Sequence, residues 1–280
     1  MTSEKHEDFD AGAYWKDRVV SGSDLGVVGH RSVGHHYNVE IYARRLEVLG
    51  EMLERHVSKP VDQCRVLDIG CGSGFYTEYW QARGVRDYLG LDISSETIGH
   101  LSQRFPDYDF VQVDITADSL EQDDIHGQFD LIMIFDVLFH IVDDSRFDNV
   151  IRHIGSLLAD DGRLLITDHL CPTKYQLSRH VVYRARDGYL AQFEEQDLVL
   201  ADAELLFHYL MPPITGNRFV DYLAAATFKV TGMIVSLSNR LATWTAKRVR
   251  HLDARLRVKG RKVSNNEMFV FRKFEAQPGE

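Results

Sequence analysis

Cysteine is scarce in this chain: Cys64, Cys71 and Cys171 are the only three among 280 residues. An odd number of cysteines gives no disulfide framework, and the spacing of these three matches no zinc motif. We therefore expect a protein of a reducing compartment, the cytoplasm, without a cysteine metal site.

Long apolar runs are also lacking. Residues 1–8 contain no apolar core of a signal peptide, and no apolar run reaches the length that spans a bilayer. We therefore expect neither export nor a membrane span. Repeats and low-complexity segments are absent as well, and a content of 44% hydrophobic residues is enough to bury a substantial core.

Positive charge is in deficit, with 32 Lys and Arg against 42 Asp and Glu and a formal net charge of -10. A surface of this sign repels phosphate backbones, so we predict no nucleic-acid partner. Local basic patches remain compatible with this balance.

The most informative stretch that is present is glycine-rich: Asp68-Ile-Gly-Cys-Gly-Ser-Gly74 follows the apolar run Cys64–Leu67 and precedes a helical pattern. A strand, a glycine turn and a helix N-terminus let backbone N–H groups approach a ligand closely. The spacing is not the G-x-G-x-x-G of dinucleotide sites, and Asp68 would repel a pyrophosphate. The motif therefore favours a cationic or zwitterionic ligand.

Further strands follow this turn and alternate with helical patterns, which predicts a parallel α/β sheet. Asp92 ends the second strand, where its carboxylate can accept hydrogen bonds from both hydroxyls of a ribose. One helix is predicted to begin at Ser94, which has the side chain of an N-cap, and another over 143–158, where apolar residues recur at helical spacing. The strands are predicted at 65–69, 87–92, 108–113, 129–135 and 162–168.

These motifs resemble the class I S-adenosylmethionine-dependent methyltransferases, whose first motif is an acid followed by alternating glycines after strand one. The resemblance covers about residues 66–168 and, more loosely, 204–274. It implies a Rossmann-like, seven-stranded, mostly parallel sheet with helices on both faces. The final strands, at 204–211 and 267–274, would form an antiparallel pair, with a helical insertion before the last one and a helical lid at the N-terminus.

The resemblance also implies the cofactor, S-adenosylmethionine, with S-adenosylhomocysteine as its product. Asp114 would accept a hydrogen bond from the adenine amino group while Ile115 and Ile93 cover the two faces of the ring. Tyr14 and Arg18 would close over the sulfonium and the cofactor carboxylate. The predicted cofactor residues are Asp68, Gly70, Gly72, Gly74, Asp92, Ile93, Asp114, Ile115, Phe135, Tyr14 and Arg18.

Chemistry is predicted after the fourth strand, in the segment Phe135–Asp144. Asp136 and His140 are four residues apart and would share one face of a helix. We predict that both are catalytic and that His140 is the general base for a hydroxyl acceptor. A divalent ion bound by this pair stays open as an alternative, although no metal site is predicted; ubiquinone-biosynthesis O-methyltransferases resemble this segment but carry Glu where Asp136 and Phe139 stand.

Two segments flank the core. The first contains a histidine and aromatic cluster, His30, His35, His36 and Tyr37, predicted to line the substrate, followed by a helical pattern over 38–53. The second has apolar residues at helical spacing over 219–244 and a basic part over 247–262. We expect a long helix or a helical hairpin that packs on the core, contacts a membrane or lipid through 217–262, or forms a homodimer through the same surface.

The predicted division is a lid segment at 1–60, a methyltransferase core at 61–214, an amphipathic insertion at 215–264 and a last strand with a tail at 265–280. The predicted function is O-methylation of a small molecule such as a saccharide, a lipid-linked intermediate or a secondary metabolite. N-methylation of a small amine stays open. So does a noncatalytic cofactor-binding or assembly protein that uses the insertion.

Overall fold

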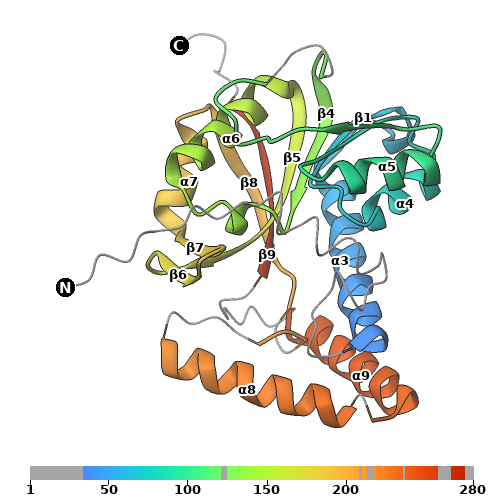
Figure 1. Ribbon diagram of the computed structural model, residues 1–280, viewed down its shortest axis with the longest axis vertical. Coiled ribbons are helices and arrows are strands. Elements are labelled where there is room, and N and C mark those ends of the chain that lie inside the picture. The colour runs from blue at the N-terminus through green and yellow to red at the C-terminus, as the bar shows by residue number, and fades with distance from the viewer. Residues whose placement is uncertain are drawn as a thin grey trace.

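The computed structural model describes residues 34–120, 125–207, 210–212, 217–235, 237–257 and 266–274. At its centre are five parallel strands in the order β3-β2-β1-β4-β5 (Figure 1). They are β1 (Arg65–Ile69), β2 (Asp87–Asp92), β3 (Asp109–Gln112), β4 (Phe129–Phe135) and β5 (Leu158–Cys171). All five predicted strands are therefore confirmed, with bounds that differ by a few residues.

Beyond β5 the sheet continues with β9 (Asn266–Lys273), which is antiparallel to β5, and then β8 (Leu198–Leu205), which is antiparallel to β9. The predicted antiparallel arrangement of the last strand is thus confirmed. The predicted strand at 204–211 was placed too late: β8 ends at Leu205, and Leu206 and Phe207 after it are buried in the core.

A short hairpin, β6 (Tyr175–Ser178) and β7 (Val181–Ala185), extends the sheet where β7 pairs with Leu170 and Cys171 at the end of β5. The described residues therefore contain nine strands rather than the predicted seven. Seven of them form the expected Rossmann-like sheet. The hairpin adds two more beside the carboxyl ends of β4 and β5.

Helices cover both faces of the sheet, because alternate side chains of its strands point to opposite sides. From β4, Leu131 and Met133 enter one core with α3 (Gly34–His56), α4 (Phe75–Ala82) and α5 (Ser95–Arg104). Ile132 and Ile134 enter the other core with α6 (Asp144–Leu157) and α7 (Arg186–Glu194).

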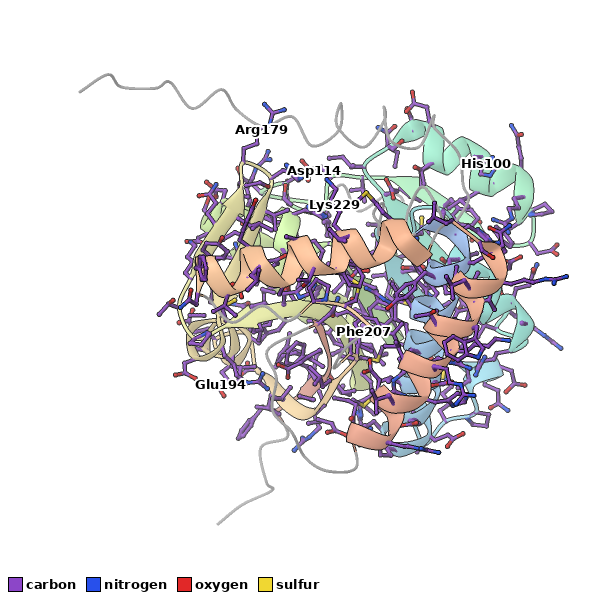
Figure 2. The ribbon with its side chains drawn as sticks, turned by 90° about the horizontal axis from the view of Figure 1, so that it is seen from below. His100, Asp114, Arg179, Glu194, Phe207 and Lys229 are labelled. Carbon is purple, nitrogen blue, oxygen red and sulfur yellow. The ribbon has the colours of Figure 1, made fainter. Side chains whose placement is uncertain are left out.

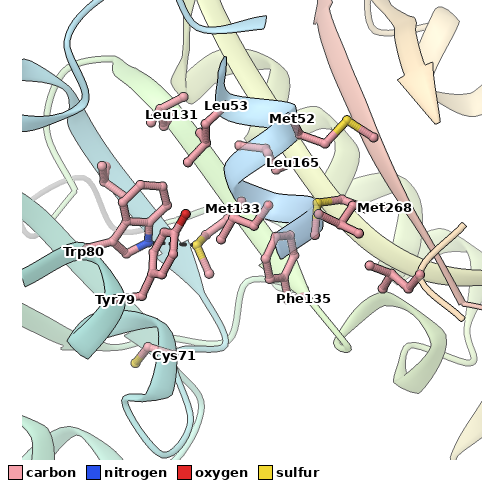
Figure 3. Packing of buried hydrophobic residues seen from close by; sticks show 14 of the residues in the cluster. Met52, Leu53, Cys71, Tyr79, Trp80, Leu131, Met133, Phe135, Leu165 and Met268 are labelled. Carbon is pink, nitrogen blue, oxygen red and sulfur yellow. Dashed lines mark hydrogen bonds between the residues drawn. The ribbon is translucent and has the colours of Figure 1, made fainter. Parts of the chain in front are cut away.

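Figure 3 shows the first core, where the indole N–H of Trp80 donates to the sulfur of Met133 at 3.0 Å. The predicted N-cap at Ser94 is confirmed, and the structure adds Asp143 as the N-cap of α6. The Ser94 hydroxyl accepts from the Thr97 N–H, and the Asp143 carboxylate accepts from the Arg146 N–H. Short 3-10 turns lie at Val61–Gln63 and Leu138–His140.

The late insertion is a helical hairpin of α8 (Arg218–Val235) and α9 (Asn239–Arg257). α9 packs against α3, and α8 runs across the end of the molecule below β6, β7 and β9 (Figure 1). Of the two forms expected from sequence, the hairpin is the one observed. Within the part of the chain that the structure describes, no helix has the length and apolar character needed to cross a bilayer.

Candidate cofactor and acceptor site

The glycine loop connects β1 to α4 and is tied to the end of β2 by two backbone bonds, in which Gly70 and Cys71 donate to the Leu91 carbonyl at 2.7 and 3.0 Å. Gly70, Gly72 and Gly74 all have positive φ, which favours glycine. A Cβ on Gly70 would lie 2.4 Å from a methyl group of Val137, so the loop packs tightly against the β4 end. A Cβ on Gly72 would meet only the Gly70 carbonyl, at 3.7 Å.

Asp92 lies at the end of β2, and its carboxylate joins the glycine loop to the start of α5. One oxygen accepts from the Gly72 N–H at 3.1 Å, and the other accepts from the Ser94 N–H at 2.9 Å. Burial raises the pKa of this carboxyl, while the backbone donors oppose the shift. Each oxygen retains a second lone pair, so the pair can still accept from two hydroxyl groups.

Asp68 is placed differently, beneath the loop in the core. It is buried and accepts a hydrogen bond from the Tyr88 hydroxyl at 2.8 Å; that hydroxyl also lies 2.8 Å from the Thr77 hydroxyl. Burial raises the pKa of Asp68 to about 7 despite the hydrogen bond from Tyr88. Tyr88 and Thr77 were not predicted as site residues, although Tyr88 opens the apolar part of the second strand.

Asp114 follows β3 and has one oxygen engaged by Thr116, which donates its N–H at 2.9 Å and its hydroxyl at 2.6 Å. The other oxygen lies 3.9 Å from the Arg146 guanidinium. Ile115 is buried in the core, whereas Ile93 is half-buried and its carbonyl accepts from the Gln112 side chain. The acids at the ends of β1, β2 and β3 therefore follow one edge of the sheet, with Asp68 deeper than the others.

Phe135 ends β4 and is buried, with its ring edge-to-face against Tyr76 at 4.9 Å between centroids. Tyr76 comes from the first turn of α4, directly after the glycine loop. Aromatic packing therefore joins the cofactor loop to the end of β4. Tyr76 was not predicted as a site residue, and its place beside the loop in the sequence is the signal that could have shown it.

Asp136 does not begin a helix. It has a φ of 59°, in the left-handed region, and only a 3-10 turn at Leu138–His140 follows, so the predicted shared helical face with His140 is wrong. Its carboxylate pairs with the buried Arg45 of α3 and accepts from the Asn266 amide at 3.2 Å. The pKa of Asp136 is lowered: burial opposes the shift, but the Arg45 charge and hydrogen bond outweigh it.

His140 lies at the end of that 3-10 turn, with its Nδ1 2.9 Å from the carbonyl oxygen of His180. A carbonyl only accepts, so Nδ1 carries the hydrogen and Nε2 is the basic nitrogen of the neutral ring. The two histidine rings are stacked at 5.9 Å between centroids. His180 lies between β6 and β7, so the unpredicted hairpin sets the tautomer and orientation of His140.

His169, on β5, was also not predicted. Its ring contacts those of Phe139 and Tyr183, at centroid distances of 5.6 and 5.1 Å, and its Nδ1 is buried without a hydrogen-bond partner among the described residues. Burial lowers its pKa to about 4, against the opposite influence of Asp136, so the ring is neutral near pH 7. Its position directly after the predicted strand 162–168 was the available signal.

The N-terminal cluster is described only in part. Tyr14, Arg18 and His30 lie outside the described residues. His35 and His36 lie in the first turn of α3, with their rings edge-to-face at 5.5 Å. Tyr37 is buried, and its hydroxyl donates to the Leu210 carbonyl at 3.3 Å. Its ring packs edge-to-face on Phe228 of α8, so it joins α3 to the hairpin.

Within the described ranges, no group of three or more His, Cys, Asp or Glu side chains is arranged to hold a metal ion. Asp136 and His140 also turn to different partners, Arg45 and His180. Figure 2 views the molecule from the side on which α8 and α9 lie in front of the sheet.

Comparisons with known proteins agree with this geometry. Residues 67–164 match a family model described as a methyltransferase domain. A ubiquinone biosynthesis O-methyltransferase of Azorhizobium caulinodans is 28% identical over 130 residues, covering 44% of this chain and 49% of that protein. The human eEF1A lysine and N-terminal methyltransferase is 26% identical over 244 residues, covering 79% of this chain and 34% of that protein.

Among solved structures, magnesium protoporphyrin IX methyltransferase of Synechocystis has a TM-score of 0.53 at 16% identity, covering 73% of this chain and 94% of that chain. This likeness supports the fold. The family match confirms the predicted resemblance to the S-adenosylmethionine-dependent methyltransferases over residues 67–164. The chain spans about half or less of the length of the curated relatives described above.

Proposed function

We propose that this protein is an S-adenosylmethionine-dependent methyltransferase that methylates a hydroxyl group of a small molecule, with His140 as general base. The observation that carries the proposal is the division of one sheet edge into two parts. Carboxylates lie at or just after the carboxyl ends of β1, β2 and β3. His140 and His169 lie at the ends of β4 and β5. Ligands of open α/β sheets bind at this edge.

The residues on the first part suit the cofactor. Gly72 leaves open space where a side chain would stand, Asp92 has lone pairs for two ribose hydroxyls, and the second oxygen of Asp114 suits an amino group on adenine. When bound, S-adenosylmethionine supplies a methyl group attached to a positively charged sulfur. The sulfur is the leaving group and keeps the electron pair of the broken carbon–sulfur bond. Acids suit such a charge better than they suit phosphates.

The residues on the second part suit a hydroxyl acceptor. A hydroxyl must lose its proton as its oxygen takes the methyl group, and Nε2 of His140 is the nitrogen that can receive that proton. His169 is a poorer base because burial lowers its pKa to about 4. Its buried Nδ1 instead suits a hydrogen bond that orients the acceptor beside the cluster that His169 forms with Phe139 and Tyr183.

Asp136 has a supporting part in this proposal. Its carboxylate is ionised and held by Arg45, Asn266 and Thr167, so it is not available as a base. Its negative charge acts on His169, where it favours the protonated ring against the larger effect of burial.

A methyl-transfer assay with a panel of alcohols, phenols and amines tests this proposal. We expect product from hydroxyl acceptors, and we expect His140→Ala to lower kcat about a hundredfold while leaving S-adenosylhomocysteine affinity nearly unchanged. His100→Ala is a matched control, because His100 is exposed on α5.

Full activity of the His140 variant would exclude that residue as the base. Turnover of amines alone would favour N-methylation, the kind of activity for which the human relative is named. Tight cofactor binding without turnover on any acceptor would favour the noncatalytic alternative.

A further inference from the structure

α8 has its apolar side turned away from the protein. The side chains of Phe219, Tyr222 and Met233 are 75%, 74% and 55% exposed, and Leu223 and Val230 on the same side are about half exposed. These positions recur at three- and four-residue steps and form one stripe. Phe228, on the opposite side, packs against Tyr37 of α3. The helix is therefore held by a narrow inner face and presents a wide apolar outer face.

α9 contributes positive charge to the neighbouring surface. Its exposed side chains include Arg240, Lys247 and Arg248, and none of the three forms an ion pair with another described residue. Trp244 lies among them, 59% exposed, with the Arg248 guanidinium 5.4 Å from the centre of its ring. By contrast, Arg250 faces inward and pairs with Glu40 and Glu47 of α3.

The charge of the hairpin is opposite to that of the whole protein. Residues 218–257 contain eight Arg and Lys against two Asp, in a chain of formal net charge -10. Neither aspartate belongs to the outer surface: Asp253 is buried and accepts from the Leu210 N–H, and Asp221 is half-buried on the inner side of α8. The outer surface therefore combines apolar, aromatic and cationic side chains without an exposed carboxylate among the described residues.

We propose that this surface, the outer face of α8 and α9, docks on an anionic lipid bilayer. Phe219, Tyr222 and Met233 would enter the interfacial region, Trp244 would lie at headgroup level, and the α9 cations would contact lipid phosphates. Docking through one surface requires that both helices lie on the same side of the molecule. Figure 2 shows α8 and α9 together in front of the sheet.

Charge decides against a second copy as the occupant. A symmetric dimer through this surface would bring the same cations of two copies together, with no exposed carboxylate there to compensate. A bilayer with anionic headgroups offers a partner for both components of the surface: negative charge for its cations and an apolar layer for its apolar side chains. This inference is independent of the acceptor proposed above.

Flotation of the full chain with vesicles tests the proposal, using phosphatidylcholine alone and a mixture with phosphatidylglycerol. We expect binding to the mixed vesicles at about 0.05 M salt, much weaker binding at about 0.5 M, and little binding to phosphatidylcholine. Arg240→Gln/Lys247→Gln and, separately, Phe219→Gln/Met233→Gln should each lower the partition coefficient about tenfold or more.

Matched controls lie on the opposite edge of the sheet, where Arg83 and Arg86 precede β2 and Phe274 follows β9. Arg83→Gln/Arg86→Gln and Phe274→Gln should bind vesicles as the unchanged chain does, and circular dichroism checks that every variant is folded. The proposal is overturned if the unchanged chain does not float, if binding is equal on both vesicle types, or if the hairpin variants bind as their controls do. If the unchanged chain does not float, and light scattering shows that it is a dimer which the Phe219→Gln/Met233→Gln change dissociates, the surface belongs to a second copy.

Discussion

Two aspartates on neighbouring strands have different environments in this site. Asp92 is half-buried at the end of β2, where two backbone N–H groups donate to its carboxylate. Asp68, one strand away, is buried and forms a hydrogen-bonded cluster with the hydroxyl groups of Tyr88 and Thr77. The same residue type therefore suits direct contact with a ligand in one position and support of the loop in the other.

The first residue-scale prediction concerns Asp92. Asp92→Ala should weaken S-adenosylhomocysteine binding by about 1 to 3 kcal/mol, because two hydrogen-bond acceptors for the ribose are lost. Calorimetric titration measures this change. Asp92→Asn is the matched variant, since it keeps one acceptor oxygen and should lose less. Equal affinity in Asp92→Ala and the unchanged chain would exclude the ribose role.

The second concerns the buried Asp68. Its pKa of about 7 in the folded protein lies above its ordinary value of 3.8, so between about pH 4 and 7 the folded state holds a proton that the unfolded state releases. This group therefore makes the free energy of unfolding fall as pH rises through that range, by up to about 1.4 kcal/mol per pH unit.

Asp68→Asn stays neutral and should remove that contribution. Urea unfolding at pH 5 and pH 7 measures the difference for both proteins. A part of the fall should remain in the variant, because burial also raises the pKa of Asp168 to about 7. An unchanged pH dependence in the variant would show that Asp68 does not hold its proton in the folded state.

Between elements, the ion pair of Arg45 with Asp136 connects α3 to the end of β4. Arg45 is buried, and its guanidinium also lies 5.5 Å from the ring centre of Tyr42 and 5.7 Å from that of Phe207. α3 thus contacts the end of β4 through Arg45 and also packs against α9. Tyr37 belongs to the same helix.

Removal of this pair should therefore act on the fold as well as on the site. Arg45→Leu leaves Asp136 without its cation and should lower the free energy of unfolding by about 1 to 3 kcal/mol, at the low end for such pairs because 32% of the Asp136 side chain is exposed. Arg45→Leu/Asp136→Asn should recover part of that loss in urea unfolding. A double variant as unstable as the sum of its single changes would show that the two groups do not interact.

Among the elements, the five parallel strands and the starts of two helices were predictable because apolar strand runs, the capping residue Ser94 and apolar helical spacing after Asp143 are local signals. β8 was misplaced because Leu206, Phe207 and Leu210 continue the apolar pattern but pack into the helical core after the strand has ended. The strands of the β6–β7 hairpin have only four and five residues, which is too short for periodicity to reveal them.

The cofactor part of the site was more predictable than the acceptor part. Its three acids, Asp68, Asp92 and Asp114, are close in sequence to the ends of their strands. Strand prediction alone therefore locates them at the edge of the sheet. Arg45 and His180 join the site through contacts with Asp136 and His140 across 91 and 40 positions. The left-handed backbone of Asp136 has no such sequence signal either, since it depends on packing around the β4 end.

At the scale of the whole molecule, two cores on either side of the sheet hold one functional edge, and the α8–α9 hairpin lies beneath that edge (Figure 1). The division into segments 1–60, 61–214, 215–264 and 265–280 stays a prediction. In the structure, the second and fourth segments share one sheet, because β9 lies between β5 and β8.

Calorimetric titration of the full chain with S-adenosylhomocysteine, with NAD as the comparison ligand, tests the central claim most directly. We predict saturable binding of S-adenosylhomocysteine that raises the unfolding temperature, and no heat or thermal stabilisation with NAD. Stabilisation by NAD, or absence of binding by S-adenosylhomocysteine, would contradict the assignment of the glycine loop and its acids to this cofactor.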